Sequence, residues 1–216
     1  MRGIWSIRYS LLTTLIAVMA VIVPYATASS QTITDEWDAV KIPPAPAIRP
    51  ISLDPKTTAL LLLDFNKQTC NAERRPRCIS SVPKVKQLLD RARTSGVSII
   101  YSLSAGAAPA DIALDLAPHP GEPAVTSGPD KFLGTDLEKL LKEKNIQSVI
   151  VAGTAAHGAV LYTASGAALR GMKVVIPVDG LSAETLYPEQ YTVWHLSNAP
   201  RVSGQVTISS SELINF

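Results

Sequence analysis

The sequence predicts an α/β fold, a three-layer α-β-α sandwich around a mostly parallel, Rossmann-like sheet. Continuous apolar runs, typical of strands buried on both faces of a parallel sheet, recur between residues 58 and 208. Segments with the apolar spacing of helices separate these runs. Strands that alternate with helices in this way form a parallel sheet that helices cover on both faces.

The first predicted strand is the apolar run at residues 58–63, which ends at Asp64. Further strands are predicted at residues 97–102, 148–152, 173–178 and 205–208, with a short one near 124–125. Residues 104–130 are rich in Gly and Pro and have little periodicity. We expect them to form a long crossing segment, of the kind that often shapes a site.

Four helices are predicted between the strands. Apolar residues from Val82 to Ala92 have helical spacing, and Gly96 marks the end of that helix. Thr135 is the expected N-cap of a helix over residues 136–144. The remaining two helices are predicted at residues 157–169 and 188–196.

The first 28 residues have the pattern of a secretory signal peptide. Arg2 and Arg8 make the start basic, residues 11–23 form an apolar run, and residues 26–28 fit a small-residue cleavage site. The apolar run is shorter than the ~20 residues that cross a bilayer, so we expect cleavage near Ala28 and no stable membrane anchor. The mature protein is then expected to be periplasmic or secreted.

Residues 29–56 are predicted to be a Pro-rich lead-in without regular structure, which drapes over the domain. Its prolines include Pro43, Pro44, Pro46, Pro50 and Pro55. The domain itself is expected to comprise residues 57–216.

Loss of the signal peptide balances the charge. The chain has 20 Lys and Arg and 18 Asp and Glu, so removing Arg2 and Arg8 leaves equal numbers. No long basic stripe remains, and nucleic acid and anionic membrane surfaces are therefore not expected partners. The densest basic cluster, residues 74–77, is predicted to be a solvated loop, with an anion site as the alternative.

Cys70 and Cys78 are the only cysteines, and export would place them in an oxidising compartment where thiols pair. We predict a disulfide, and closure of a loop of roughly nine residues is worth about 2.6 kcal/mol in the chain-entropy estimate. The three histidines, His119, His157 and His195, show no close ligand spacing. Neither a metal ion nor an organic cofactor is expected.

Polar residues follow several of the predicted strands. Asp64, residues 153–159 and Asp179 each come just after an apolar run, and residues 130–136 precede a helix. Ligands of open α/β sheets bind beyond the carboxyl ends of the strands, so we expect a site at this edge. Asp179 and Gly180 are more typical of a turn that closes the sheet.

These segments resemble the isochorismatase-like cysteine hydrolase superfamily, which contains nicotinamidases, carbamoylsarcosine amidases and isochorismatases. Ala59-Leu-Leu-Leu-Leu-Asp64 is similar to the family's first strand and acid, and Phe132-Leu-Gly-Thr-Asp-Leu137 to its Phe-x-x-Thr-x-Leu segment. Residues 153–168 are similar to its strand, elbow and following helix. The resemblance covers residues 57–210 and implies a small-molecule substrate and homo-oligomerisation.

The resemblance makes Asp64 the catalytic acid, but the family's nucleophile is absent. Ala159 stands six positions after Gly153, where the thiol hydrolases carry cysteine, and a methyl group cannot attack a carbonyl. The family lysine usually lies six residues before the Phe, where this chain has Thr126. Lys131 is therefore either a replacement that reaches the pocket or a solvated loop residue.

The resemblance also implies a pocket at the elbow, where relatives have a cis peptide after the glycine and bind an oxyanion with backbone amides. Thr154, Ala155, His157 and Ala159 are thus candidate substrate-binding residues. The isochorismatases that cleave a vinyl ether resemble this chain in having Ala-His and then a small residue at the nucleophile position. Their acid protonates the substrate directly, a role that burial favours and a nearby cation opposes.

Two functions are consistent with these residues. One is a hydrolase that binds a small carboxylate or carbonyl compound and uses Asp64 without a thiol. The other is a pseudoenzyme that keeps the fold as a binding or assembly protein. The aromatic residues Tyr187, Tyr191 and Trp194 have helical spacing and are expected in the core or at a subunit contact.

Overall fold

The computed structural model describes residues 32–216. The chain divides into two units, one that ends at Ile42 and one from Pro43 to Phe216. In the first unit, a single 3-10 turn (Trp37–Ala39) lies within the described residues, and the predicted signal peptide lies outside them. No helix between residues 32 and 216 is long and apolar enough to cross a membrane.

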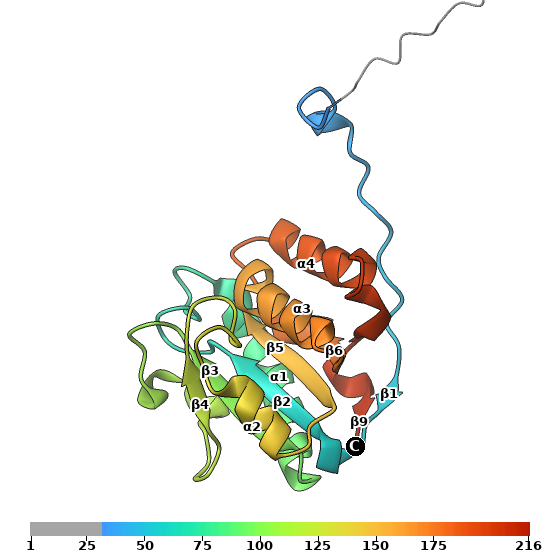
Figure 1. Cartoon of the computed structure of the whole chain (residues 1–216). Helices are drawn as coiled ribbons and strands as arrows, with labels where there is room; N and C mark the ends of the chain where they lie inside the picture. The colour runs from blue at the N-terminus through green and yellow to red at the C-terminus, as the bar shows by residue number, and fades with distance from the viewer. Residues whose placement is uncertain (1–31) are drawn as a thin grey trace, which may run out of the picture. The chain divides into compact units, whose positions relative to one another are not determined.

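The second unit is the predicted α/β sandwich around a parallel sheet (Figure 1). The strand order is β4-β3-β2-β5-β6-β8, and all of these pairs are parallel. The strands are β2 (Thr58–Leu63), β3 (Ser98–Leu103), β4 (Ala124–Thr126), β5 (Ser148–Thr154), β6 (Lys173–Pro177) and β8 (Val206–Ser209). A short strand, β7 (Leu181–Ser182), pairs with the end of β5.

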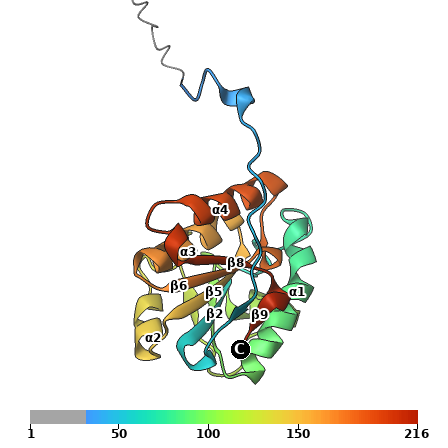
Figure 2. The ribbon, with the colours of Figure 1, turned by 90° about the vertical axis from the view of Figure 1, so that its right-hand side faces the viewer.

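Helices cover both faces of the sheet, as Figures 1 and 2 show. Alternate residues of β2 point to opposite faces: Leu60 and Leu62 pack with α1 (Pro76–Thr94), whereas Leu61 and Leu63 pack in the other core cluster. That second cluster includes residues of α2 (Leu137–Glu143), α3 (Leu161–Leu169) and α4 (Leu186–Asn198). Full burial of one leucine side chain is worth about 1.5–3 kcal/mol, so β2 is a large contributor to both cores.

Several element boundaries differ from the prediction. Helix α1 begins at Pro76, six residues earlier than expected, because proline fits the first turn of a helix, where its missing N–H leaves no bond unmade. The helix expected from His157 begins as a π-helical turn, Ala156–Val160, that leads into α3. Helix α2 has Asp136 at its N-cap, although the Thr135 hydroxyl still accepts a bond from the Leu137 N–H, at 3.1 Å.

The prediction of no regular structure in the lead-in was wrong near its end. Ile51–Ser52 forms β1, which pairs in parallel with β9 (Ile214–Asn215) at the C-terminus, and the two strands lie together in Figure 2. The Arg49 N–H donates to the Ile208 carbonyl of β8, at 2.9 Å. The Ser209 hydroxyl donates back to the Arg49 carbonyl, at 2.8 Å, so the lead-in lies against β8 at this point.

Asp179 lies in the predicted turn, a 3-10 turn at Val178–Gly180. Its carboxylate accepts bonds from the Ser211 N–H and hydroxyl, at 2.8 and 2.7 Å. The turn therefore also holds the C-terminal segment to the sheet.

The predicted disulfide between Cys70 and Cys78 is present, with the two Cα atoms 5.3 Å apart. It links the loop after β2 to the first turn of α1. Replacing both cysteines by alanine is expected to lower the free energy of unfolding by about 2–3 kcal/mol, because the unfolded chain loses its closed loop. Denaturant unfolding of the double variant, compared with the oxidised wild-type protein, measures this loss. A loss under about 0.5 kcal/mol would show that the bond does not restrict the unfolded chain as the chain-entropy estimate requires.

Candidate active site

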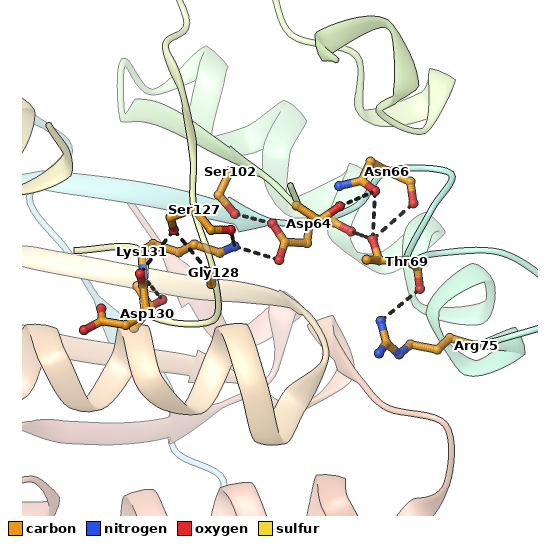
Figure 3. Close-up of polar contacts among 11 residues, drawn as sticks. Asp64, Asn66, Thr69, Arg75, Ser102, Ser127, Gly128, Asp130 and Lys131 are labelled. Carbon is orange, nitrogen blue, oxygen red and sulfur yellow. Dashed lines mark hydrogen bonds and ion pairs between the residues drawn. The ribbon is translucent and has the colours of Figure 1, made fainter. Parts of the chain in front are cut away.

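Asp64 is the first residue after β2 and adopts a left-handed backbone conformation, with φ 55°. Aspartate tolerates this conformation better than most residues do. Its N–H donates to the Ser102 carbonyl of β3, at 3.2 Å, and its side chain is buried. The Ser102 hydroxyl in turn donates to Asp64 Oδ1, at 2.8 Å (Figure 3). Backbone and side chain thus both fix the carboxylate at the carboxyl end of the sheet.

Lys131 reaches this carboxylate from the loop that follows β4. Its Nζ lies 2.8 Å from Asp64 Oδ2, and its side chain is almost completely buried. Nζ also donates to the Ser127 carbonyl, at 3.4 Å, while the Lys131 N–H bonds to the Thr163 hydroxyl of α3, at 3.3 Å. The alternative of a solvated loop lysine was wrong.

The Asp64–Lys131 ion pair forms without a lysine at residue 126. Thr126 occupies the usual lysine position at the end of β4 and is exposed. Figure 3 shows the Lys131 side chain pointing to Asp64 from five residues further along the chain. Burial of two charges costs several kcal/mol per ion before their attraction is counted, so a packing role alone would be filled as well by apolar side chains.

Ala159 lies in the π-helical turn Ala156–Val160 and is buried. Both cysteines are in the disulfide, so no free thiol exists among the described residues. A cis peptide bond joins Thr154 to Ala155, one residue beyond the glycine that precedes the turn. The elbow thus has the form implied by the resemblance, with a methyl group at the nucleophile position.

Gly153 brings the elbow against the strand that carries Asp64. A Cβ on Gly153 would lie 2.5 Å from the Leu63 carbonyl oxygen and 2.6 Å from Leu63 Cβ, closer than atoms pack. Only glycine therefore fits where β5 passes the end of β2.

The four candidate substrate-binding residues have different environments. The Thr154 hydroxyl donates to the Ser182 carbonyl, at 3.1 Å, and is turned to β7. Ala155 is half-buried, and its carbonyl accepts bonds from the Gly158 and Val160 N–H groups, at 3.0 and 3.3 Å. His157 is exposed, whereas Ala159 is buried. Their binding roles stay predictions.

The basic cluster at residues 74–77 was expected to be a solvated loop; this was wrong for Arg75, whereas Arg74 and Arg77 are exposed. Arg75 is buried and binds Glu184 Oε1 with Nε and Nη2, at 2.8 and 2.7 Å, and the Thr69 carbonyl with Nη1, at 3.2 Å. The Thr69 hydroxyl donates to the Asp64 carbonyl (Figure 3). Arg77 forms a two-bond ion pair with Glu189 of α4. Arg75 therefore ties the loop after Asp64 to the segment before α4, and Arg77 ties α1 to α4.

Arg75 also controls the charge on Glu184. Burial raises the pKa of the Glu184 carboxyl, but the hydrogen bonds and charge of Arg75 outweigh burial, and the pKa is lowered from its ordinary value of 4.5. His157 adds a smaller effect in the same direction. Glu184 is therefore an anion at neutral pH.

Replacing Arg75 by methionine is expected to destabilise the protein at pH 7 and to matter less in acid. The Glu184 pKa is lower in the folded than in the unfolded state, so the stabilisation is complete above 4.5 and is lost as pH falls through the folded value. The difference in unfolding free energy between wild type and variant should shrink from pH 7 to pH 3, as denaturant series at each pH would measure. Arg74→Met is the control, since Arg74 Nε lies 3.9 Å from Glu184 and the side chain is exposed. A pH-independent difference for Arg75→Met would contradict this account.

The aromatic residues of α4 are not in the core. Tyr187, Tyr191 and Trp194 are 74%, 40% and 46% exposed, so the core alternative was wrong. The subunit-contact alternative stays a prediction.

The side chains of the site are largely buried. Asp64, Ser102, Lys131 and Ala159 are each at most 6% exposed. Two surface hollows of about 370 and 410 Å³ lie elsewhere, one at the C-terminus beside Arg91 and the other beside Arg93 and Lys144.

Comparison with known proteins identifies the family of this chain. The family model described as the isochorismatase domain matches residues 58–207, well over half of the chain. The chain belongs to the isochorismatase family. The chain is also similar to streptothricin hydrolase of Streptomyces noursei. The two are 27% identical over 190 residues, which cover 80% of this chain and 67% of the relative.

Solved isochorismatase-family structures share the fold. An isochorismatase family protein from Desulfovibrio vulgaris has a TM-score of 0.66 at 21% identity, covering 72% of this chain and 95% of that one. N-carbamoylsarcosine amidase from Thermoplasma acidophilum has a TM-score of 0.62 at 19% identity, covering 72% of this chain and 97% of that one. A nicotinamidase from Staphylococcus aureus has a TM-score of 0.64 at 18% identity, covering 70% of this chain and 96% of that one. At these identities the likeness establishes the α/β architecture alone.

Sequence reasoning missed Ser102 and Thr69, which hold Asp64 through its carboxylate and its carbonyl. A signal for Ser102 was present. It is the next-to-last residue of β3 and lies beside Leu63 in the parallel register, next to Asp64. No comparable signal exists for Thr69, because its contact depends on the turn of an irregular loop.

Proposed function

We propose that this isochorismatase-family protein is a small-molecule hydrolase that works without a thiol and uses the Asp64–Lys131 pair for proton transfer. The observation that supports the proposal is the buried contact of 2.8 Å between Lys131 Nζ and Asp64 Oδ2. Lys131 comes from a different backbone position than the family lysine, yet it delivers an ammonium group to the same carboxylate. The substrate would be a small carbonyl compound such as an amide, ester or lactone.

The ion pair favours one of the two proton-transfer roles considered for Asp64, general base or direct acid. An ammonium group at this distance stabilises the negative charge on the carboxylate. Asp64 is therefore suited first to accept a proton from an attacking group and then to return it to the leaving group. Direct protonation of a vinyl ether, which starts from a neutral carboxyl, is less favoured than the sequence suggested.

The alternative is a pseudoenzyme, a protein that binds a small ligand without turnover. Two observations favour it: the methyl group of Ala159 at the nucleophile position, and the burial of Asp64 and Lys131. In this alternative the ion pair would bind a polar ligand or would serve stability alone.

Turnover of a panel of small amides, esters, lactones and vinyl ethers by the wild-type protein and by Asp64→Asn separates the two. Asparagine suits the left-handed backbone at this position and can still accept the Ser102 bond, but it cannot take a proton. We expect the variant to lose a factor of about 10²–10⁴ in rate on the substrate that is cleaved. Equal turnover by both proteins, or none by either, would remove the hydrolase proposal. As a control, denaturant unfolding of the variant should show that it is folded.

A further inference from the structure

Ser102 completes an arrangement of three side chains around the Asp64 carboxylate. Its hydroxyl donates to Oδ1 at 2.8 Å, while Lys131 Nζ lies 2.8 Å from Oδ2. A nucleophile in hydrogen-bond reach of a base, with a third group orienting the base, is the general arrangement of nucleophilic catalysis. Figure 3 shows Ser102 and Lys131 on the two oxygens of the one carboxylate.

Other hydroxyls near the site are directed elsewhere. The Ser104 hydroxyl donates to Asn66 Oδ1, the Thr69 hydroxyl to the Asp64 carbonyl, and the Ser127 hydroxyl to the Gly128 and Asp130 carbonyls. Among residues 32–216, Ser102 provides the hydroxyl that bonds to the Asp64 carboxylate.

We propose that Ser102 is the nucleophile of this protein and replaces, from strand β3, the thiol that is missing at Ala159. This inference rests on the proposed hydrolase function and adds a covalent acyl-serine intermediate to it. The substrates would be small esters, lactones or amides, whose carbonyl carbon can accept an attacking oxygen.

The chemistry balances with water as the only co-reactant. Ser102 Oγ bonds to the carbonyl carbon while its proton passes to Asp64 Oδ1, and the tetrahedral oxyanion is stabilised by the Lys131 ammonium group. The bond to the leaving group then breaks, and that group takes the proton from Asp64. Water next gives a proton to Asp64 and attacks the acyl carbon, after which Ser102 Oγ leaves and recovers the proton.

A different role for Ser102 would be to orient Asp64, and a covalent probe distinguishes the two. Methanesulfonyl fluoride is a small reagent that forms a sulfonate ester with a nucleophilic serine and releases fluoride. We expect intact-mass measurement to find one adduct on the wild-type protein and peptide mapping to locate it at Ser102. The adduct should be absent in Ser102→Ala and at least 100-fold slower to form in Asp64→Asn.

Ser104→Ala is the matched control, since Ser104 directly follows β3 but bonds to Asn66. It should be labelled at the wild-type rate. No label on the wild-type protein, a label that remains in Ser102→Ala, or a labelling rate in Asp64→Asn equal to that of the wild type would overturn the proposal.

The failure of this inference would differ from failure of the proposed function. If the wild-type protein cleaves a substrate, Asp64→Asn does not, and Ser102 is never labelled, then water attacks directly and only the nucleophile proposal is lost. Loss of turnover in Ser102→Ala without any adduct would likewise assign Ser102 as a positioning residue and overturn the inference.

Discussion

Replacing Lys131 by methionine is expected to lower the free energy of unfolding by about 3–5 kcal/mol. The substitution keeps most of the side-chain volume but leaves the Asp64 carboxylate buried beside an apolar chain. The wild-type pair is almost dehydrated, with 1% and 9% side-chain exposure, so water cannot replace the lost ammonium group without rearrangement of the surrounding loops. Chemical denaturation at pH 7 measures the loss.

The double variant Asp64→Asn/Lys131→Met is the test of the cause. Because it removes both charges, it should recover most of the stability lost by Lys131→Met alone. Lys67→Met is a matched control, since Lys67 pairs with Asp111 at 2.6 Å but is 72% exposed, and we expect it to cost under about 1 kcal/mol. If Lys131→Met were as mild as Lys67→Met, or the double variant as unstable as Lys131→Met, the buried charge would not be the reason for the loss.

Gly153→Ala is expected to destabilise the protein by about 3 kcal/mol or more. The new methyl group would overlap the Leu63 carbonyl oxygen and Cβ, at 2.5 and 2.6 Å. The atoms that must yield are mostly backbone of a central strand, which cannot turn aside as the end of a flexible side chain can. Separation of β5 from β2 would also displace the elbow from Asp64, so the proposed activity should fall with stability.

Gly158→Ala provides the control in the same elbow. Its added Cβ would meet only the Ala155 side chain, at an ordinary 3.7 Å, and it should change the free energy of unfolding by less than about 1 kcal/mol. Denaturant unfolding of the two variants side by side makes the comparison. Equal effects of the two substitutions would contradict the close approach of Gly153 to Leu63.

The sequence predicted the sheet well because its strands are buried on both faces. A run such as Thr58–Leu63 is apolar along its whole length, as expected of a strand buried on both faces. Because helices alternate with such runs, the strands are expected to be parallel. Asp64 and the segment at residues 153–159 were placed at one edge by the same argument. The disulfide followed from two cysteines close in sequence.

Other features depended on contacts between distant segments. The lead-in has no apolar pattern of its own, and Ile51–Ser52 became a strand because Ile214–Asn215 offered backbone partners. Arg75 looked like part of a solvated loop until the fold brought Glu184 and the Thr69 carbonyl against it. Charged residues in loops carry no local signal that separates a buried partner from solvent.

For this protein, the sequence by itself determined the α/β class, the position of Asp64 at the end of a buried strand, and the absence of a thiol at residue 159. Those properties follow from local patterns and residue identity. Only the tertiary structure decided that Lys131 and Ser102 share the Asp64 carboxylate. Lys131 lies 67 residues from Asp64 and Ser102 lies 38, and side chains so far apart in sequence meet only when strand order and loop path bring them together.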